Sequence, residues 1–262
     1  MKNIFPLLFF IPLISLTQIN IETKYTVPNG FERIYNDDYS RFLRQFPLKN
    51  NNIVKLHDNT DKVNNNIWDA VFDYDIGKGD LHQCADAVLY MRANFLYKKG
   101  LINKLHYNFV SGFKASYSDY ITHFYKIDNN NVSLVPRSRN LIDNSETLLK
   151  WLRQIFSYAN TWSIDKYDSF SINILEIRPG DFFIKSNPPP SYGHAVNVVD
   201  VAVNKETNKK VFMLSQSYMP AQETHVLINP KNGSVWYSLD EFNDIITPEW
   251  TFTVNQLKRF NN

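Results

Sequence analysis

The chain has 262 residues, 44% of them hydrophobic and 15% aromatic, with 28 basic and 26 acidic side chains. This composition predicts a folded protein with a sizeable core and excludes a chain that is disordered or membrane-embedded along its whole length. A net charge of +2 at pH 7 gives none of the basic excess that nucleic-acid binding needs.

The first residues, MKNIFPLLFFIPLISLTQ, have the order of a secretory signal peptide. Lys2 gives a basic start, an apolar run follows, and Ser15 and Thr17 are small residues suited to cleavage before Gln18. The run is short for a bilayer and holds two prolines, which disfavours the alternative of an uncleaved anchor. We therefore expect residues 1–17 to be removed. The mature protein is expected to be exported, periplasmic or secreted, without a membrane span.

The rest of the chain shows no repeat or low-complexity linker, which predicts one domain over residues 24–260. A short helix is expected over Asp37–Gln45. A longer helix is expected to begin after Asp80, a good N-cap residue, and to reach Lys98 before Gly100 ends it.

The later part of the chain changes to strand patterns. A second long helix begins at Asn144 or Ser145, and β-branched and aromatic runs follow it. Strands are expected over 67–74, 182–185, 194–203 and 210–218, with a hairpin turn at NKETNK and a last short helix over Ser238–Ile245. Helices early and an antiparallel sheet late indicate an α+β fold.

Cys84 is the only cysteine, so it has no partner for an internal disulfide. In an exported protein a lone thiol indicates a reactive group, an intermolecular bond or a buried bystander. Its place in the first turns of a helix favours a lowered thiol pKa, since a helix N-terminus carries partial positive charge. Its place on the apolar stripe of that helix, with Val88 and Met91, is equally typical of a buried structural thiol.

Two polar residues of the predicted sheet complete a candidate site with Cys84. His194 opens a strand directly after a loop, and Gln216 lies in the next strand. A nucleophile, a base and a residue that orients the base are what covalent catalysis requires. Candidate catalytic residues are therefore Cys84, His194 and Gln216, and candidate substrate-binding residues are Gln83, Tyr218 and Gln222.

The stretches QCADAV and RPGDFFIK…GHAVNVVDVAV resemble NlpC-type cell-wall peptidases, which are small papain-like cysteine enzymes. The resemblance implies a papain-like fold in which the nucleophile-bearing helix packs on an antiparallel sheet. It implies Cys84 as nucleophile, His194 as base, Gln216 as orienting residue and Gly180-Asp181 as the turn before a strand. Gln83 and Ala85 depart from the Asp-Cys-Ser run of those enzymes, and the spacing from Cys84 to the turn is longer.

A wider resemblance covers nearly all of the chain that follows the predicted signal peptide. VPNGFERI, DLHQCADAVLYMRANFLY, SQSYMPAQ and WYSLDEF are similar to an uncharacterised family of exported bacterial proteins, domain of unknown function 4846. The family name carries no activity.

Other polar residues are expected to be structural. His82 is expected at the surface, His225 within a strand, and Asp86 and Arg92 solvated or ion-paired on the long helix. Asp200 lies too far along its strand from His194 to join a triad. The scattered histidines show no metal-ligand spacing, so we expect no metal and no cofactor.

Two functions remain open on these residues. The first is an exported cysteine hydrolase or amidase that acts on an amide bond through Cys84 and His194, with a peptide or peptidoglycan-like substrate. The second is a non-catalytic peptide- or glycan-binding protein on the same fold. The sequence leaves the oligomeric state open.

Overall fold

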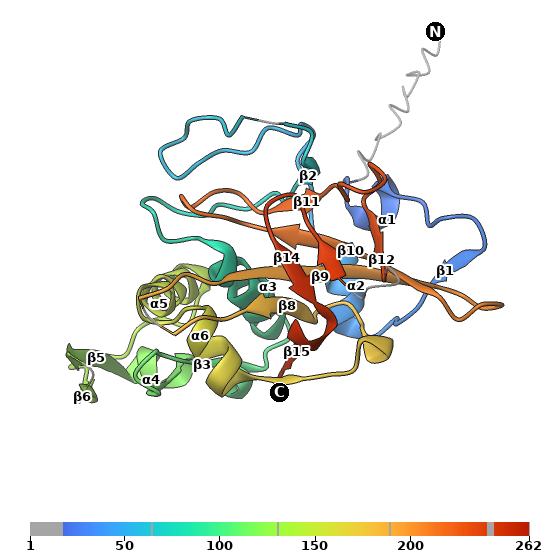
Figure 1. Cartoon of the computed structure of the whole chain (residues 1–262). Coiled ribbons are helices and arrows are strands. Elements are labelled where there is room, and N and C mark those ends of the chain that lie inside the picture. Colours follow the sequence, from blue (N-terminus) through green and yellow to red (C-terminus); the bar gives the residue numbers. More distant parts are fainter. Residues whose placement is uncertain (1–17, 64, 130, 189, 240–243, 262) are drawn as a thin grey trace, which may run out of the picture.

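The computed structural model describes residues 18–63, 65–129, 131–188, 190–239 and 244–261 (Figure 1). The predicted signal peptide, residues 1–17, lies outside the described residues. The chain folds as an α+β structure around one large sheet whose pairings are antiparallel. Among the described residues, no helix is both long and apolar enough to cross a membrane.

The large sheet has nine strands in the described part of the chain, and its central order is β2-β11-β10-β9-β8-β15-β7. β1 also pairs with β9, and β12 with β10. The strands are β1 (Phe31–Arg33), β2 (Trp68–Val71), β7 (Ser169–Ser171), β8 (Phe182–Lys185), β9 (His194–Asn204), β10 (Lys210–Gln216), β11 (His225–Leu227), β12 (Trp236–Ser238) and β15 (Leu257–Phe260).

Helices and three small hairpins surround this sheet (Figure 1). The helices are α1 (Ile21–Lys24), α2 (Asp38–Arg44), α3 (Cys84–Lys98), α4 (Tyr117–Thr122), α5 (Ser145–Tyr158) and α6 (Thr161–Ser163). The hairpins pair β3 (His106–Asn108) with β4 (Lys114–Ser116), β5 (His123–Asp128) with β6 (Asn131–Pro136), and β13 (Asp244–Ile246) with β14 (Thr251–Thr253).

The long central strand β9 separates two hydrophobic clusters. Ala195 and Val199 belong to the larger cluster, which also contains α3 and α5 side chains such as Val88 and Trp151. Val196 belongs to the smaller cluster on the other face, with Phe252 of β14. This arrangement follows from the alternation of side chains along a strand. It explains why β9 is a nearly continuous apolar run, because both of its faces are covered.

Strand β8 begins after the predicted Pro-Gly-Asp turn. Gly180 has φ +94, and a Cβ there would lie 2.4 Å from Cε1 of Tyr39, so the turn needs glycine. Asp181 is buried and accepts hydrogen bonds from the backbone N–H of Arg178 and the guanidinium of Arg259. The turn is thereby fixed, and β8 pairs with β9 in the register Lys185↔His194.

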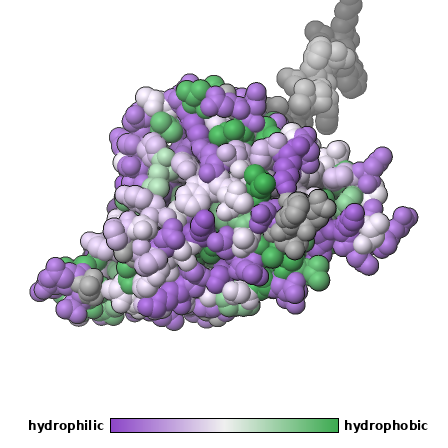
Figure 2. Space-filling model, viewed as in Figure 1, coloured by the Kyte–Doolittle hydropathy of each residue, from purple (hydrophilic) through white to green (hydrophobic). Residues whose placement is uncertain are grey.

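Most predicted elements are present, with two corrections. The helix expected after Asp80 begins four residues later, at Cys84. The short helix expected over Ser238–Ile245 is wrong where the structure describes it, because Ser238 ends β12 and Asp244–Ile246 is strand β13. Residues 240–243 lie outside the described residues. The surface in Figure 2 is largely hydrophilic, with hydrophobic residues in small separate groups.

Candidate active site

Cys84 is the first residue of α3 and follows the N-cap residue Gln83. The backbone N–H of Gln83 donates to Asp86 Oδ2 at 2.9 Å, which anchors the helix start. Asp80 does not cap the helix, because its carboxylate accepts hydrogen bonds from the backbone N–H of Ala221 at 2.6 Å and from Gln83 Nε2 at 3.0 Å. The nucleophile candidate therefore lies at the first position of the helix, where the backbone N–H groups have no helical partner.

Burial dominates the protonation of the Cys84 thiol. The pKa of this thiol is raised to about 12, chiefly by desolvation, and the carboxyl of Asp86 acts in the same direction. Hydrogen bonds from the backbone amides of Ala195, Ala85 and Cys84 itself act in the opposite direction but are weaker. The helix N-terminus lowers this pKa as expected, but burial outweighs it, so the expected net decrease is wrong for the resting protein. The thiol carries its proton at neutral pH.

His194 is the first residue of β9, and its imidazole is 1% exposed. Its Nε2 lies 2.8 Å from Oε1 of Gln216, the last residue of β10. Burial lowers the pKa of His194 to about 4, so the ring is neutral at pH 7 and is able to accept a proton. The structure thus brings together the candidate base and the candidate orienting residue.

Aromatic side chains enclose the His194–Gln216 contact. The His194 ring stacks on Trp250 with centroids 5.2 Å apart, and Tyr218 packs against it edge-on at 5.0 Å. Trp250 Nε1 donates to the Tyr218 hydroxyl at 3.0 Å, which ties the two rings together. Tyr218, a predicted substrate-binding residue, therefore covers the base. A contact enclosed in this way is shielded from water and strengthened by the low local dielectric.

The thiol and the imidazole approach the start of β9 from its two sides. Ala195 faces α3, and the Cys84 sulfur accepts from its backbone N–H. The preceding residue, His194, turns its ring to the opposite face, against Trp250 and Phe252. The peptide unit between His194 and Ala195 thus contacts the thiol through the Ala195 N–H. The imidazole of His194 lies on the opposite face of β9. The structure places Cys84 beside the backbone that presents His194.

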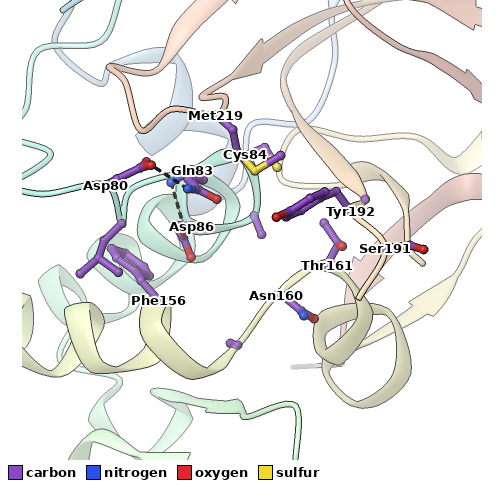
Figure 3. Close-up of a pocket in the computed structure, with 14 residues that line it drawn as sticks. Asp80, Gln83, Cys84, Asp86, Phe156, Asn160, Thr161, Ser191, Tyr192 and Met219 are labelled. Carbon is purple, nitrogen blue, oxygen red and sulfur yellow. Dashed lines mark hydrogen bonds between the residues drawn. The ribbon is translucent and has the colours of Figure 1, made fainter. Parts of the chain in front are cut away.

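A pocket of about 130 Å³ opens beside Cys84 (Figure 3). In Figure 3, Tyr192 and Met219 flank the sulfur, while Asn160 and Thr161 lie on the far side of the cavity. Its lining comprises Asp80, Leu81, Gln83, Cys84, Ala85, Asp86, Phe156, Ala159, Asn160, Thr161, Ser191, Tyr192, Gly193 and Met219. The Cys84 residue is only 5% exposed, but it borders a cavity that is open to solvent.

Two acidic residues line this pocket, and their carboxyl groups lie in different environments. The hydrogen bond from the Ala221 N–H holds the pKa of Asp80 below its usual value, so this carboxylate is ionised at pH 7. Burial instead raises the pKa of Asp86 well above its usual value. The cavity combines the ionised Asp80 with the amide of Asn160 and the hydroxyl of Thr161. Such a lining suits a polar, amide-containing group.

The remaining predicted positions divide between this pocket and the core. Gln83 lines the pocket. Gln222 does not; it is 1% exposed, and its Nε2 donates to the Pro220 carbonyl at 3.3 Å. His82 is also 1% exposed, with Nε2 2.9 Å from the Tyr74 hydroxyl, so the expected surface position is wrong.

The other polar side chains considered in the sequence, His225, Asp86, Arg92 and Asp200, are buried. His225 is buried in β11, as predicted. Asp86 and Arg92 are buried rather than solvated. Asp200 forms ion pairs with Arg33 at 2.6 Å and Arg44 at 3.5 Å, away from His194. Within the described ranges, no group of three histidine, cysteine or acidic residues is placed to hold a metal ion.

The sequence reasoning missed Glu249 and Trp250, which complete the surroundings of His194. Glu249 accepts a hydrogen bond from Gln216 Nε2 and forms an ion pair with Lys62 at 3.2 Å. The segment that carries both residues lies just before β14, far along the chain from Cys84 and without a recognisable motif. The string TPEW, in which an acid adjoins a tryptophan, gave the only local signal.

One comparison with known proteins gives a match. A family model described as a domain of unknown function (4846) matches residues 21–259. No curated protein and no solved structure is similar enough to match.

Proposed function

The chain belongs to the family of domain of unknown function 4846, and we propose that it is an exported cysteine hydrolase with a papain-like catalytic arrangement. Cys84 is the nucleophile, His194 the base and Gln216 the residue that orients the base. The observations that carry the proposal are the hydrogen bond between His194 Nε2 and Gln216 Oε1, and a Cys84 thiol that borders a pocket and contacts the backbone N–H of Ala195, the residue after His194.

The first chemical step is attack by the Cys84 sulfur on an amide carbonyl held in the pocket. In the proposed step the proton moves from sulfur to His194 as the S–C bond forms, against the resting pKa values of about 12 for the thiol and about 4 for the imidazole. The C–N bond then breaks, and His194 returns this proton to the leaving amine. Water, deprotonated by His194, hydrolyses the thioester and regenerates the thiol.

Backbone amides at the start of α3 are suited to stabilise the oxygen of the tetrahedral intermediate. The N–H groups of Cys84 and Ala85 reach the sulfur in the resting protein and have no helical acceptor. An oxyanion next to the sulfur is within their reach, and such donors contribute several kcal/mol to catalysis, about 3–4 for one donor in a well-studied case. No side chain needs to move for them to act.

A peptide is the substrate that the pocket favours. Its amide and hydroxyl groups, from Asn160 and Thr161, match a backbone, and the ionised Asp80 at the rim favours a neighbouring amino group. Peptidoglycan peptides carry free amines and fit the resemblance to NlpC-type enzymes, by analogy only. Export, with cleavage before Gln18, would bring the protein to such a substrate. A mature chain from its native host that still begins at Met1 argues against export.

The test is turnover with trapping. Wild type and Cys84→Ala are incubated with isolated peptidoglycan and with a peptide mixture, and new amino termini are identified by mass spectrometry. We expect products with the wild type only, and a mass adduct on Cys84 after rapid acid quench. Products that persist with Cys84→Ala, or none from any amide substrate, overturn the proposal.

A specific observation favours a second function, a non-catalytic peptide- or glycan-binding protein. The resting thiol is buried with a pKa of about 12, as expected of a structural cysteine. In that case peptide or glycan binds the pocket equally well in wild type and Cys84→Ala, without turnover. Calorimetric titration of both proteins separates this function from the hydrolase.

A further inference from the structure

The side chains behind His194 form a continuous chain of polar contacts. His194 Nε2 meets Gln216 Oε1 at 2.8 Å, and Gln216 Nε2 donates to Glu249 Oε2. Lys62 Nζ then lies 3.2 and 3.4 Å from the two oxygens of Glu249. His194 and Gln216 are each 1% exposed, so water has little access to these contacts.

The carboxylate end of this chain determines the direction of every hydrogen bond in it. An ionised carboxylate only accepts, so the NH₂ group of Gln216 must face Glu249. The amide oxygen of Gln216 therefore faces His194, and an oxygen accepts. His194 Nε2 must then carry the proton. A neutral imidazole has one N–H, so Nδ1 is the bare nitrogen.

We propose that Glu249 is a positioning residue that, through the amide of Gln216, fixes neutral His194 as the Nε2–H tautomer and leaves Nδ1 to accept a proton. Without Glu249 the Gln216 amide is able to rotate by half a turn at little cost, since its two ends have nearly the same shape. Its NH₂ group then faces His194 and favours a proton on Nδ1. That tautomer has no lone pair on Nδ1 for the proton of Cys84.

Lys62 and Trp250 hold Glu249 in place for this task. Lys62 neutralises the partly buried carboxylate, and its ammonium lies 5.4 Å from the Tyr218 ring that packs on His194. Trp250, the next residue, stacks on the imidazole itself, and its backbone N–H donates to Thr247 Oγ1 at 3.1 Å. The Glu249-Trp250 segment thus contacts His194 in two ways. Trp250 touches the imidazole directly, and Glu249 acts on it indirectly through Gln216.

The catalytic consequence rests on the proposed function, but the tautomer does not, so the two are tested separately. Nitrogen NMR of ¹⁵N-histidine-labelled protein at pH 7 reads the proton position on His194, with His194→Ala to assign the signals. We expect Nε2–H in the wild type. In Glu249→Gln, whose amide is able to donate as well as accept, we expect a mixture or the Nδ1–H form.

Glu22→Gln is the matched control, because Glu22 is exposed, lies in α1 and accepts a hydrogen bond from Gln45. It is expected to keep the wild-type tautomer. With an identified substrate, Glu249→Gln lowers kcat by about tenfold or more, part of the roughly 100- to 10,000-fold that a positioned base contributes. KM changes little, since Glu249 does not line the pocket.

The outcomes separate the two claims. An Nδ1–H wild type, or an Nε2–H form that persists in a folded Glu249→Gln, overturns the inference whatever the activity. The predicted tautomers in a protein with no turnover uphold the role of Glu249 in orienting His194 and overturn the hydrolase. Circular dichroism of each variant establishes that it is folded, and Glu249→Asp serves as a second variant that keeps the acceptor.

Discussion

Ser217 joins the two halves of the candidate site through the backbone of His82. Its buried hydroxyl lies 2.8 Å from the His82 carbonyl, two residues before Cys84, and 2.6 Å from the Gln222 carbonyl. Its neighbours in sequence are Gln216 and Tyr218, which both contact His194. Ser217 therefore ties the segment just before α3, which begins at Cys84, to the end of β10, where Gln216 contacts His194.

Replacing Ser217 by alanine is expected to loosen this connection. Buried carbonyls left without a donor cost about 1–3 kcal/mol, so the free energy of unfolding measured in urea should fall by that amount. Ser215→Ala is the matched control, because the Ser215 hydroxyl, two residues before Ser217, is buried in β10 without a hydrogen-bond partner among the described residues. Equal effects of the two variants contradict the assignment.

The ionisation of Cys84 gives a second prediction. Its pKa is raised by burial, so the thiol remains protonated well past the usual range, up to about pH 12. Thiolate absorbance, taken as the difference between wild type and Cys84→Ala to remove the tyrosines, should develop only at strongly alkaline pH. A thiolate already present near neutral pH indicates instead a preformed ion pair with His194.

His82 makes the folded state sensitive to acid. Burial lowers its pKa to about 3 in the folded protein, against a usual value of 6.5. The unfolded chain therefore binds the proton more readily, and this contribution to stability is complete above pH 6.5 and is lost as the pH falls towards 3. Each pH unit in that window costs at most about 1.4 kcal/mol.

The comparison of wild type with His82→Gln isolates this effect from that of buried carboxyl groups such as Asp168, whose raised pKa acts in the opposite direction. Between pH 7.5 and 5, the wild type should lose about 2 kcal/mol more of its unfolding free energy than the variant. Parallel pH profiles for the two proteins contradict a buried, neutral His82.

Gly193 is expected to tolerate no side chain. A Cβ there would lie 2.2 Å from the Lys185 carbonyl oxygen and 2.4 Å from Thr161 Oγ1. Gly193→Ala must displace the end of β8 or α6, and such overpacking costs about 1–3 kcal/mol. The thermal midpoint should fall, whereas Ser191→Ala, at an exposed position of the same loop, should leave it unchanged.

The sequence predicts the main elements because their local signals agree with their final environments. Asn144 caps α5 as its residue type suggests, and its side chain accepts from the Thr147 N–H at 2.9 Å. The apolar run of β9 fits a strand covered on both faces. Local signals failed at Asp80, an N-cap residue by type that is recruited by Ala221, a residue distant in sequence.

The site was predictable only in part for a related reason. Cys84, His194 and Gln216 stand out because each is a chemically active or polar residue at the end of a helix or strand. The pKa of the thiol was not predictable, since the helix N-terminus is visible in the sequence but the burial that outweighs it is not. Glu249 is likewise invisible, because only the fold brings it to Gln216.

The most direct test of the account is the rate at which a peptidyl electrophile labels Cys84 at pH 7, followed by intact-mass spectrometry. Folded wild type, folded His194→Ala and both chains in denaturant are compared. If His194 takes the thiol proton, the folded wild type is labelled at Cys84 faster than the unfolded chain. His194→Ala then loses about tenfold or more in the folded state only. A folded wild type that resists labelling until denaturant is added, at a rate unchanged by His194→Ala, contradicts the account.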